Sequence, residues 1–168
     1  MIIKKALVKT GAFFVLLYLK KMELEIREIH GKENMMKNYA LLLNVYPTLT
    51  REAYEIELDA MLSLNYGQVG IFDGSECLGM TGYWIGSKLW CGKYMELDNV
   101  VIEKKYRSKG IGEQLFSYME DKAKNENCAM MALDTYSTNF KAHKFFYSQG
   151  FVPRGFHFIN ILNKKAIR

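Results

Sequence analysis

Two glycines close together in a basic turn mark the stretch of this chain best suited to hold phosphate. The turn reads Arg107-Ser108-Lys109-Gly110-Ile111-Gly112, and apolar residues recur after it at helical spacing, which predicts a helix that begins at the turn. The first N–H groups of a helix have no partner inside the helix and lie at the positive end of its dipole. Arg107 and Lys109 add positive charge. The turn therefore predicts a binding site for phosphate oxygens.

Two common nucleotide-binding motifs do not fit this turn. A dinucleotide fingerprint needs a third glycine at the position of Leu115. A P-loop needs Gly-Lys followed by Ser or Thr, and the chain contains no such run. What remains is Arg-x-x-Gly-x-Gly at the entry to a helix. The alternative is an ordinary basic turn that binds no ligand.

Two carboxylates precede the turn, on the strand predicted for residues 90–102. Glu96 and Asp98 are two residues apart, so their side chains point to the same face of a strand, whereas Leu97 points to the other face. A carboxylate placed in this way can accept a proton from an amine. Two alternatives stay open: both acids are exposed strand residues, or they bind a positively charged ligand while water carries the proton.

Two segments resemble motifs of one family, the GNAT N-acetyltransferases. Tyr106 to Gly112 resembles the signature with which these enzymes bind the pyrophosphate of acetyl-CoA. The second segment, with one residue more between Ala142 and Tyr147 than the simplest form of its motif, contains Asn139, Ala142, Phe145, Phe146, Tyr147, Gly150 and Phe151. The resemblance covers residues 22–162.

This resemblance implies an enzyme that moves an acetyl group from acetyl-CoA, its cosubstrate, to a primary amine by direct transfer in a ternary complex. It implies that Tyr147 donates a proton to the departing sulfur, and that Asp98, with Glu96 as second choice, accepts the proton of the amine. The residues implied for acetyl-CoA binding are Val100, Val101, Ile102, Arg107, Ser108, Lys109, Gly110, Ile111, Gly112, Asn139, Ala142 and Phe146. No metal is implied. The alternative from another class is a non-catalytic acyl-CoA-binding or sensor domain with the same fold.

The elements that must position these residues follow from periodicity and turn signals. Strands are predicted at 22–29, 68–72, 77–85, 90–102, 128–135 and 156–162, and helices at 32–46, 50–64, 111–124 and 140–148. Turns are expected at Asp73-Gly74 and at Gly86-Ser87-Lys88. The order of elements predicts an α+β protein, and the resemblance implies a mixed, mostly antiparallel sheet with helices on both faces.

Composition predicts one globular domain. The chain has 168 residues, 49% of them hydrophobic, which is enough for one substantial core. Its net charge of +5 comes from the five lysines of residues 1–21, while the remaining residues carry equal numbers of basic and acidic side chains. A neutral body argues against nucleic-acid binding.

Residues 1–21 are expected to be a basic and apolar N-terminal extension that precedes a single domain of residues 22–168. Their apolar run, Gly11 to Leu19, is shorter than the roughly 20 residues of a membrane-spanning helix. A membrane contact through this extension is a second interpretation.

The acceptor and the partners are less well marked. Glu96, Asp98 and the acidic helix 52–59 favour a cationic amine such as a polyamine, an aminoglycoside or a lysine side chain, although acidic residues on a helix commonly form its solvated face. The three cysteines are widely spaced and odd in number, which favours reduced thiols in a cytoplasmic protein. Homodimers are common in the family.

Overall fold

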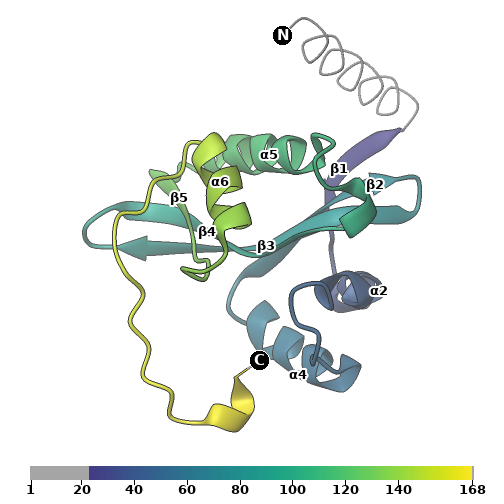
Figure 1. Ribbon diagram of the computed structural model, residues 1–168, viewed down its shortest axis with the longest axis horizontal. Helices are drawn as coiled ribbons and strands as arrows, with labels where there is room; N and C mark the ends of the chain where they lie inside the picture. Colours follow the sequence, from purple (N-terminus) through teal and green to yellow (C-terminus); the bar gives the residue numbers. More distant parts are fainter. Residues whose placement is uncertain (1–22, 168) are drawn as a thin grey trace, which may run out of the picture.

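A single five-stranded sheet forms the centre of the computed structural model, which describes residues 23–167 (Figure 1). Its strands, in the spatial order β1-β2-β3-β4-β5, are β1 (Leu24–Glu28), β2 (Tyr66–Asp73), β3 (Glu76–Lys88), β4 (Gly92–Ile102) and β5 (Met130–Leu133). The first four strands are antiparallel neighbours, and β5 is parallel to β4. The predicted α+β fold with a mixed, mostly antiparallel sheet is confirmed.

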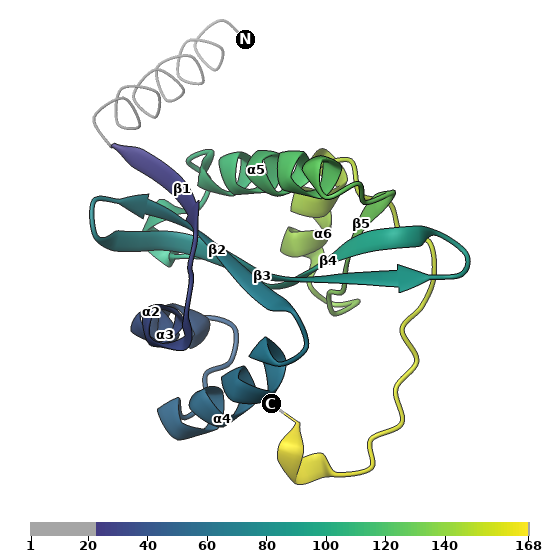
Figure 2. The same ribbon diagram turned by 180° about the vertical axis from the view of Figure 1, so that it is seen from behind.

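Helices cover both faces of this sheet (Figures 1 and 2). One face carries α2 (Lys32–Lys37), α3 (Tyr39–Leu42) and α4 (Arg51–Leu62); the other carries α5 (Ile111–Asn125) and α6 (Phe140–Ser148). Two short 3-10 turns, η1 (Lys104–Tyr106) and η2 (Lys164–Ala166), complete the elements. On the α4 face, Leu58 packs with Met80 and Val101 of the sheet. On the α5 face, Leu115, Phe116 and Met119 pack against Met95 and Leu97.

Local sequence signals set several of these boundaries. The Thr50 side chain accepts a hydrogen bond from the Ala53 N–H at 3.1 Å, which satisfies one of the unpaired donors at the start of α4. Gly74 takes the left-handed conformation, with φ of 57°, in the turn between β2 and β3. Gly150, with φ of 82°, follows the end of α6 as predicted.

The prediction of one continuous helix over residues 32–46 is wrong. The segment contains two short helices that meet at Asn38, which lies at the end of α2 and at the start of α3. The Asn38 side chain donates to the Asn34 carbonyl oxygen at 3.3 Å. A short amide side chain that bonds the backbone competes with continuous helix, and this explains the break.

The turn predicted at residues 86–88 is also wrong. Strand β3 runs on through Lys88, and Gly86 pairs with Tyr94 of β4. A Cβ at Gly86 would stand 3.1 Å from the Tyr94 ring, so the glycine makes room for a ring on the neighbouring strand and does not mark a turn. The chain turns later and enters β4 at Gly92, which has φ of 71°.

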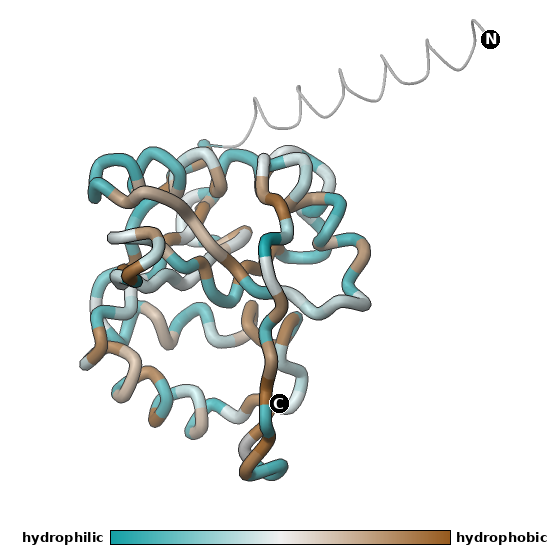
Figure 3. Tube along the Cα trace, turned by 90° about the vertical axis from the view of Figure 1, so that its left-hand side faces the viewer, coloured by the Kyte–Doolittle hydropathy of each residue, from teal (hydrophilic) through white to brown (hydrophobic). Residues whose placement is uncertain are grey.

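The strand predicted for residues 156–162 is wrong as well. Residues 152–162, here called the tail, leave the body as an extended segment that pairs with no strand of the described chain (Figure 3). Its apolar side chains lie in the open, with Phe156 90% and Phe158 89% exposed. Two contacts hold its start: His157 Nδ1 lies 2.7 Å from Asp134 Oδ2, and the Arg154 guanidinium lies 5.0 Å from the Trp90 ring. Alternation marks a segment able to form a strand, but a strand forms only where the segment lies against the edge of a sheet and pairs with it, and the tail does not.

The predicted extension of residues 1–21 lies outside the described residues, so the domain boundary at residue 22 stays a prediction. Within residues 23–167, no helix is long and apolar enough to cross a membrane.

Candidate active site

The sheet changes register on β4, at the point where the two acids lie. Met80 of β3 pairs with Val101, but Gly82 pairs with Asp98, so β4 holds one extra residue between these pairs. Asn99, which lies between these pairs, accommodates the extra residue by taking the left-handed conformation, with φ of 53°. On the other side of β4, the parallel ladder with β5 ends at Leu97, while β4 continues to Ile102. Backbone groups of β4 beyond Leu97 therefore have no partner in β5 and can bind a ligand.

The basic turn after β4 has the geometry of an anion site. Ser108 and Gly110 are both left-handed, with φ of 58° and 81°. Gly110 is the N-cap of α5 and has no side chain to cap it, so the first N–H groups of α5 point out of the helix without a side-chain acceptor. The Arg107 Nε donates to the Ile102 carbonyl oxygen at 2.9 Å, which fixes the guanidinium beside the end of β4. Lys109 Nζ lies 5.5 Å from the centre of the Tyr106 ring.

Gly112 brings α6 against α5. A Cβ at this position would stand 3.1 Å from the Phe145 ring, so the small residue permits close approach of the two helices. Phe116 of α5 contacts Phe145 and Phe146, with ring centroids 5.0 Å and 5.9 Å away. Phe146 thus packs in the core cluster of the α5 face. Ile111, also predicted as a ligand-binding residue, has a side chain that is buried in the core.

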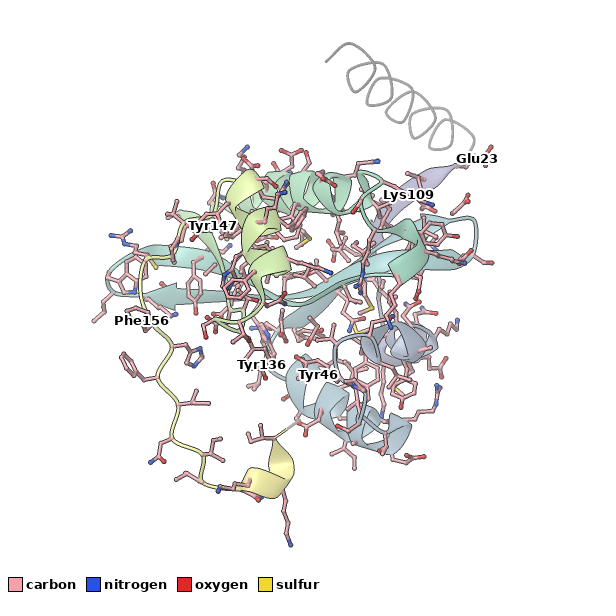
Figure 4. The ribbon with its side chains drawn as sticks, viewed as in Figure 1. Glu23, Tyr46, Lys109, Tyr136, Tyr147 and Phe156 are labelled. Atoms are coloured by element: carbon pink, nitrogen blue, oxygen red, sulfur yellow. The ribbon has the colours of Figure 1, made fainter. Side chains whose placement is uncertain are left out.

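The second motif forms the start and the end of α6. Asn139 Oδ1 accepts a hydrogen bond from the Ala142 N–H at 3.3 Å, which caps the helix. Tyr147, near the other end, is 57% exposed, because its neighbours Phe145 and Phe146 occupy the side of α6 that faces α5. Figure 4 marks Tyr147 on α6 and Lys109 in the turn before α5.

Glu96 and Asp98 do point to the same face, the one that α4 covers. On the neighbouring strand β3, Trp84 pairs with Glu96 and Gly82 pairs with Asp98. Burial raises the pKa of the Asp98 carboxyl, and the negative charge of Glu96 adds to this, whereas the Trp84 indole and the Asn99 amide oppose it. Asn99 Nδ2 donates to Asp98 Oδ2 at 2.8 Å. A partly buried carboxylate with a raised pKa has the properties of a general base.

Sequence reasoning missed three side chains on this face: Tyr66 and Gln68 of β2, and Trp84 of β3. The tilted rings of Tyr66 and Trp84 lie 5.0 Å apart, and Gln68 Nε2 donates to the Tyr66 hydroxyl at 3.1 Å. The signal that would have revealed them is the register, which aligns residues 66 and 68 with 84 and 82 and then with 96 and 98. Register across three strands cannot be obtained from periodicity in one of them.

Two acidic side chains of α4 form ion pairs with a lysine of the same chain. Lys32 Nζ lies 3.1 Å from Glu55 Oε1 and 2.7 Å from Asp59 Oδ2. These two acids are therefore partly neutralised, and they give less support to a cationic acceptor than the sequence indicated. No group of three metal-binding side chains occurs among residues 23–167.

Comparison with known proteins decides the family. A sequence profile of the Acetyltransferase (GNAT) family matches residues 33–151, a range that begins inside α2 and includes all elements from α3 to α6. The chain belongs to this family. It is an acetyl-CoA-dependent N-acetyltransferase, as the two motifs predicted. A comparison with curated protein sequences finds no match.

Solved structures agree on the fold of this acetyltransferase. The aminoglycoside N-acetyltransferase AAC(6')-Iy in complex with CoA is 17% identical, with a TM-score of 0.71, over 85% of this chain and 96% of that one. The glucosamine-6-phosphate N-acetyltransferase of Arabidopsis thaliana is 17% identical, with a TM-score of 0.65, over 83% and 99%. An acetyltransferase of Trypanosoma brucei is 18% identical, with a TM-score of 0.67, over 83% and 100%.

Proposed function

We propose that this acetyltransferase transfers the acetyl group directly to a primary amine, with acetyl-CoA and the amine bound at the same time. The observation that carries the proposal is the position of Asp98. Its side chain lies on the α4 face of β4, whereas the basic turn opens α5 on the opposite face. The β4 backbone beyond Leu97, free of β5, lies between them. Donor and acceptor can therefore approach the same stretch of β4 from opposite sides.

In this proposal the turn holds the pyrophosphate of acetyl-CoA. The open N–H groups at the start of α5 donate to its oxygens, and Arg107 and Lys109 balance its charge. The backbone of Val100, Val101 and Ile102 pairs with the pantetheine arm and polarises the thioester carbonyl. The remaining contacts proposed for acetyl-CoA come from Ser108, Gly110, Ile111, Gly112, Asn139, Ala142 and Phe146.

The proposed chemistry needs no covalent enzyme intermediate. The neutral amine nitrogen attacks the thioester carbonyl carbon, a C–N bond forms, and the C–S bond breaks. Asp98 accepts the proton that the nitrogen loses, directly or through one water, with Glu96 as second candidate. Tyr147 donates a proton to the departing sulfur and recovers one from solvent. The products are the N-acetylated amine and CoA with a free thiol.

We propose a cationic amine as the acceptor, because Glu96 and Asp98 place two carboxylates on the face that it would enter. The test is release of CoA thiol from acetyl-CoA with a panel of polyamines, aminoglycosides and lysine peptides, compared with neutral amines of similar size. Turnover with a cationic amine, lost in Asp98→Asn, is expected. A protein that binds acetyl-CoA but transfers to no amine would be a binding or sensor domain.

We propose that the enzyme is a homodimer in which each tail pairs with the β5 edge of the other copy. Among residues 23–167, strand β5 is the last strand of the sheet and pairs with β4 alone, while the tail offers alternating apolar side chains and a backbone that pairs with no strand of this range. Because one chain carries both a free edge and a free strand, exchange in a two-fold dimer satisfies both at once.

Separately, the free thiols of Cys77, Cys91 and Cys128 suit the cytoplasmic location that we propose.

A further inference from the structure

The face of the sheet around Asp98 contains a polar cluster that spans three strands. Tyr66 of β2 reaches across Gly82 of β3, since a Cβ on Gly82 would stand 2.2 Å from the Tyr66 hydroxyl oxygen. Gly82 itself pairs with Asp98 of β4. The absence of a side chain at position 82 of β3 thus lets a tyrosine of β2 reach over β3 toward the acid on β4.

Amide groups stand on both sides of the Tyr66 hydroxyl. Gln68 Nε2 donates to it at 3.1 Å from β2. On the other side, the Asn99 amide lies close enough to the Tyr66 hydroxyl to oppose the rise of its pKa, and the same amide donates to Asp98 Oδ2 at 2.8 Å. One amide, that of Asn99, therefore links the tyrosine to the carboxylate. Its left-handed backbone, with φ of 53°, is a strained conformation that a buried network can maintain.

Burial makes this network rigid. Tyr66 is 6% exposed and Gln68 is 1% exposed, and the Tyr66 ring packs against Trp84, whose indole also faces Asp98. Burial raises the pKa of the Tyr66 hydroxyl, which therefore stays protonated at neutral pH. A buried hydroxyl flanked by two amides is restrained in its orientation, and so is the amide beside it.

We propose that Tyr66 is a positioning residue that, through Asn99, fixes the Asp98 carboxylate toward the incoming amine. The inference rests on the proposed role of Asp98 as the base. It extends that role to β2, which none of the acetyltransferase motifs in this chain includes. Tyr66 itself touches no reacting atom in this proposal.

Tyr54 of α4 provides a matched control. Its hydroxyl accepts from the same Gln68 amide, at 2.9 Å, and it is 5% exposed, but it makes no contact with Asn99 or Asp98 among those described. Tyr66→Phe and Tyr54→Phe remove the same atom at equal burial and break a bond to the same partner. Only the first releases Asn99.

The experiment is a carbon-13 NMR titration of the Asp98 carboxyl in the wild type and both variants, with Asp98→Asn to assign the signal. The titratable groups that face Asp98 are Glu96 on its own strand and Tyr66 on β2, and α4 adds Tyr54 through Gln68. We expect the midpoint of Asp98 to rise in Tyr66→Phe, because Asn99 no longer holds its donor on the carboxylate, and to stay unchanged in Tyr54→Phe. In a plot of kcat/KM against pH, the midpoint of the acidic limb should likewise rise in Tyr66→Phe and stay unchanged in Tyr54→Phe.

Two outcomes would overturn the proposal. An unchanged midpoint in Tyr66→Phe would mean that Asn99 needs no support from the tyrosine. Equal shifts in both variants would assign the effect to Gln68 and the core. Because the titration needs neither acetyl-CoA nor an amine, it is independent of the proposed transfer reaction, whose failure would appear as absent turnover in the wild type.

Discussion

Substitution of Gly82 by alanine tests whether Tyr66 really crosses β3. The added methyl group would stand 2.2 Å from the Tyr66 hydroxyl oxygen and 2.6 Å from two ring carbons, so the ring must move. Forcing a side chain out of a packed position costs about 1–3 kcal/mol. Loss of the hydrogen bond from Gln68 adds about 0.5–1.5 kcal/mol. Alanine in a strand recovers roughly 0.5–1 kcal/mol relative to glycine.

These effects leave a net loss of about 0.5–4 kcal/mol in the free energy of unfolding. For a chain of this size, that loss lowers Tm by roughly 1–12 °C. The assay is thermal and urea unfolding of the wild type, Gly82→Ala, Tyr66→Leu and the double variant. In the Tyr66→Leu background the obstructing ring and hydroxyl are gone, so the cost of Gly82→Ala should largely disappear. An equal cost in both backgrounds would refute the reasoning.

Three further predictions follow from the site. Asp98→Asn should raise Tm at pH 7, because burial raises the pKa of the Asp98 carboxyl in the folded state. The protonated carboxyl contributes its full stability below the unfolded pKa of about 4, and this contribution is lost as pH rises through the folded pKa. The higher Tm of the variant should therefore vanish in melts near pH 4. Tyr147→Phe should lower kcat about 10²-fold or more in a thiol-release assay while leaving acetyl-CoA affinity unchanged; equal kcat would remove the proposed acid. Phe156→Asp combined with Phe158→Asp should give a monomer by light scattering, whereas Asn160→Asp with Asn163→Asp should leave the wild-type dimer intact; a monomeric wild type would contradict the exchange of tails.

Local patterns were enough to predict the parts of the site that depend on neighbouring residues. The turn from Arg107 to Gly112, with a helix that starts behind it, follows from glycine, charge and periodicity. The same is true of the common face of Glu96 and Asp98, which needs only the alternation of a strand.

Features that depend on distant segments were not predictable in this way. The approach of Tyr66 to Asn99 requires the register of β2, β3 and β4 together, including the extra residue that β4 holds near Asn99. The alternation in residues 156–162 predicted a strand that the structure does not contain, because alternation within one segment does not determine whether that segment pairs with the edge of a sheet. The break at Asn38 depended on one side-chain hydrogen bond.

The most direct test of the account is calorimetric titration with acetyl-CoA. The comparison is between the wild type, a double variant Arg107→Glu with Gly110→Asp, and a control, Lys165→Glu with Gly155→Asp, that makes the same charge changes at exposed positions near the C-terminus. The account predicts binding in the micromolar range or tighter for the wild type and the control, and its loss in the double variant. No binding by the wild type, or equal binding by all three proteins, would contradict the claim that the turn before α5 holds the cosubstrate.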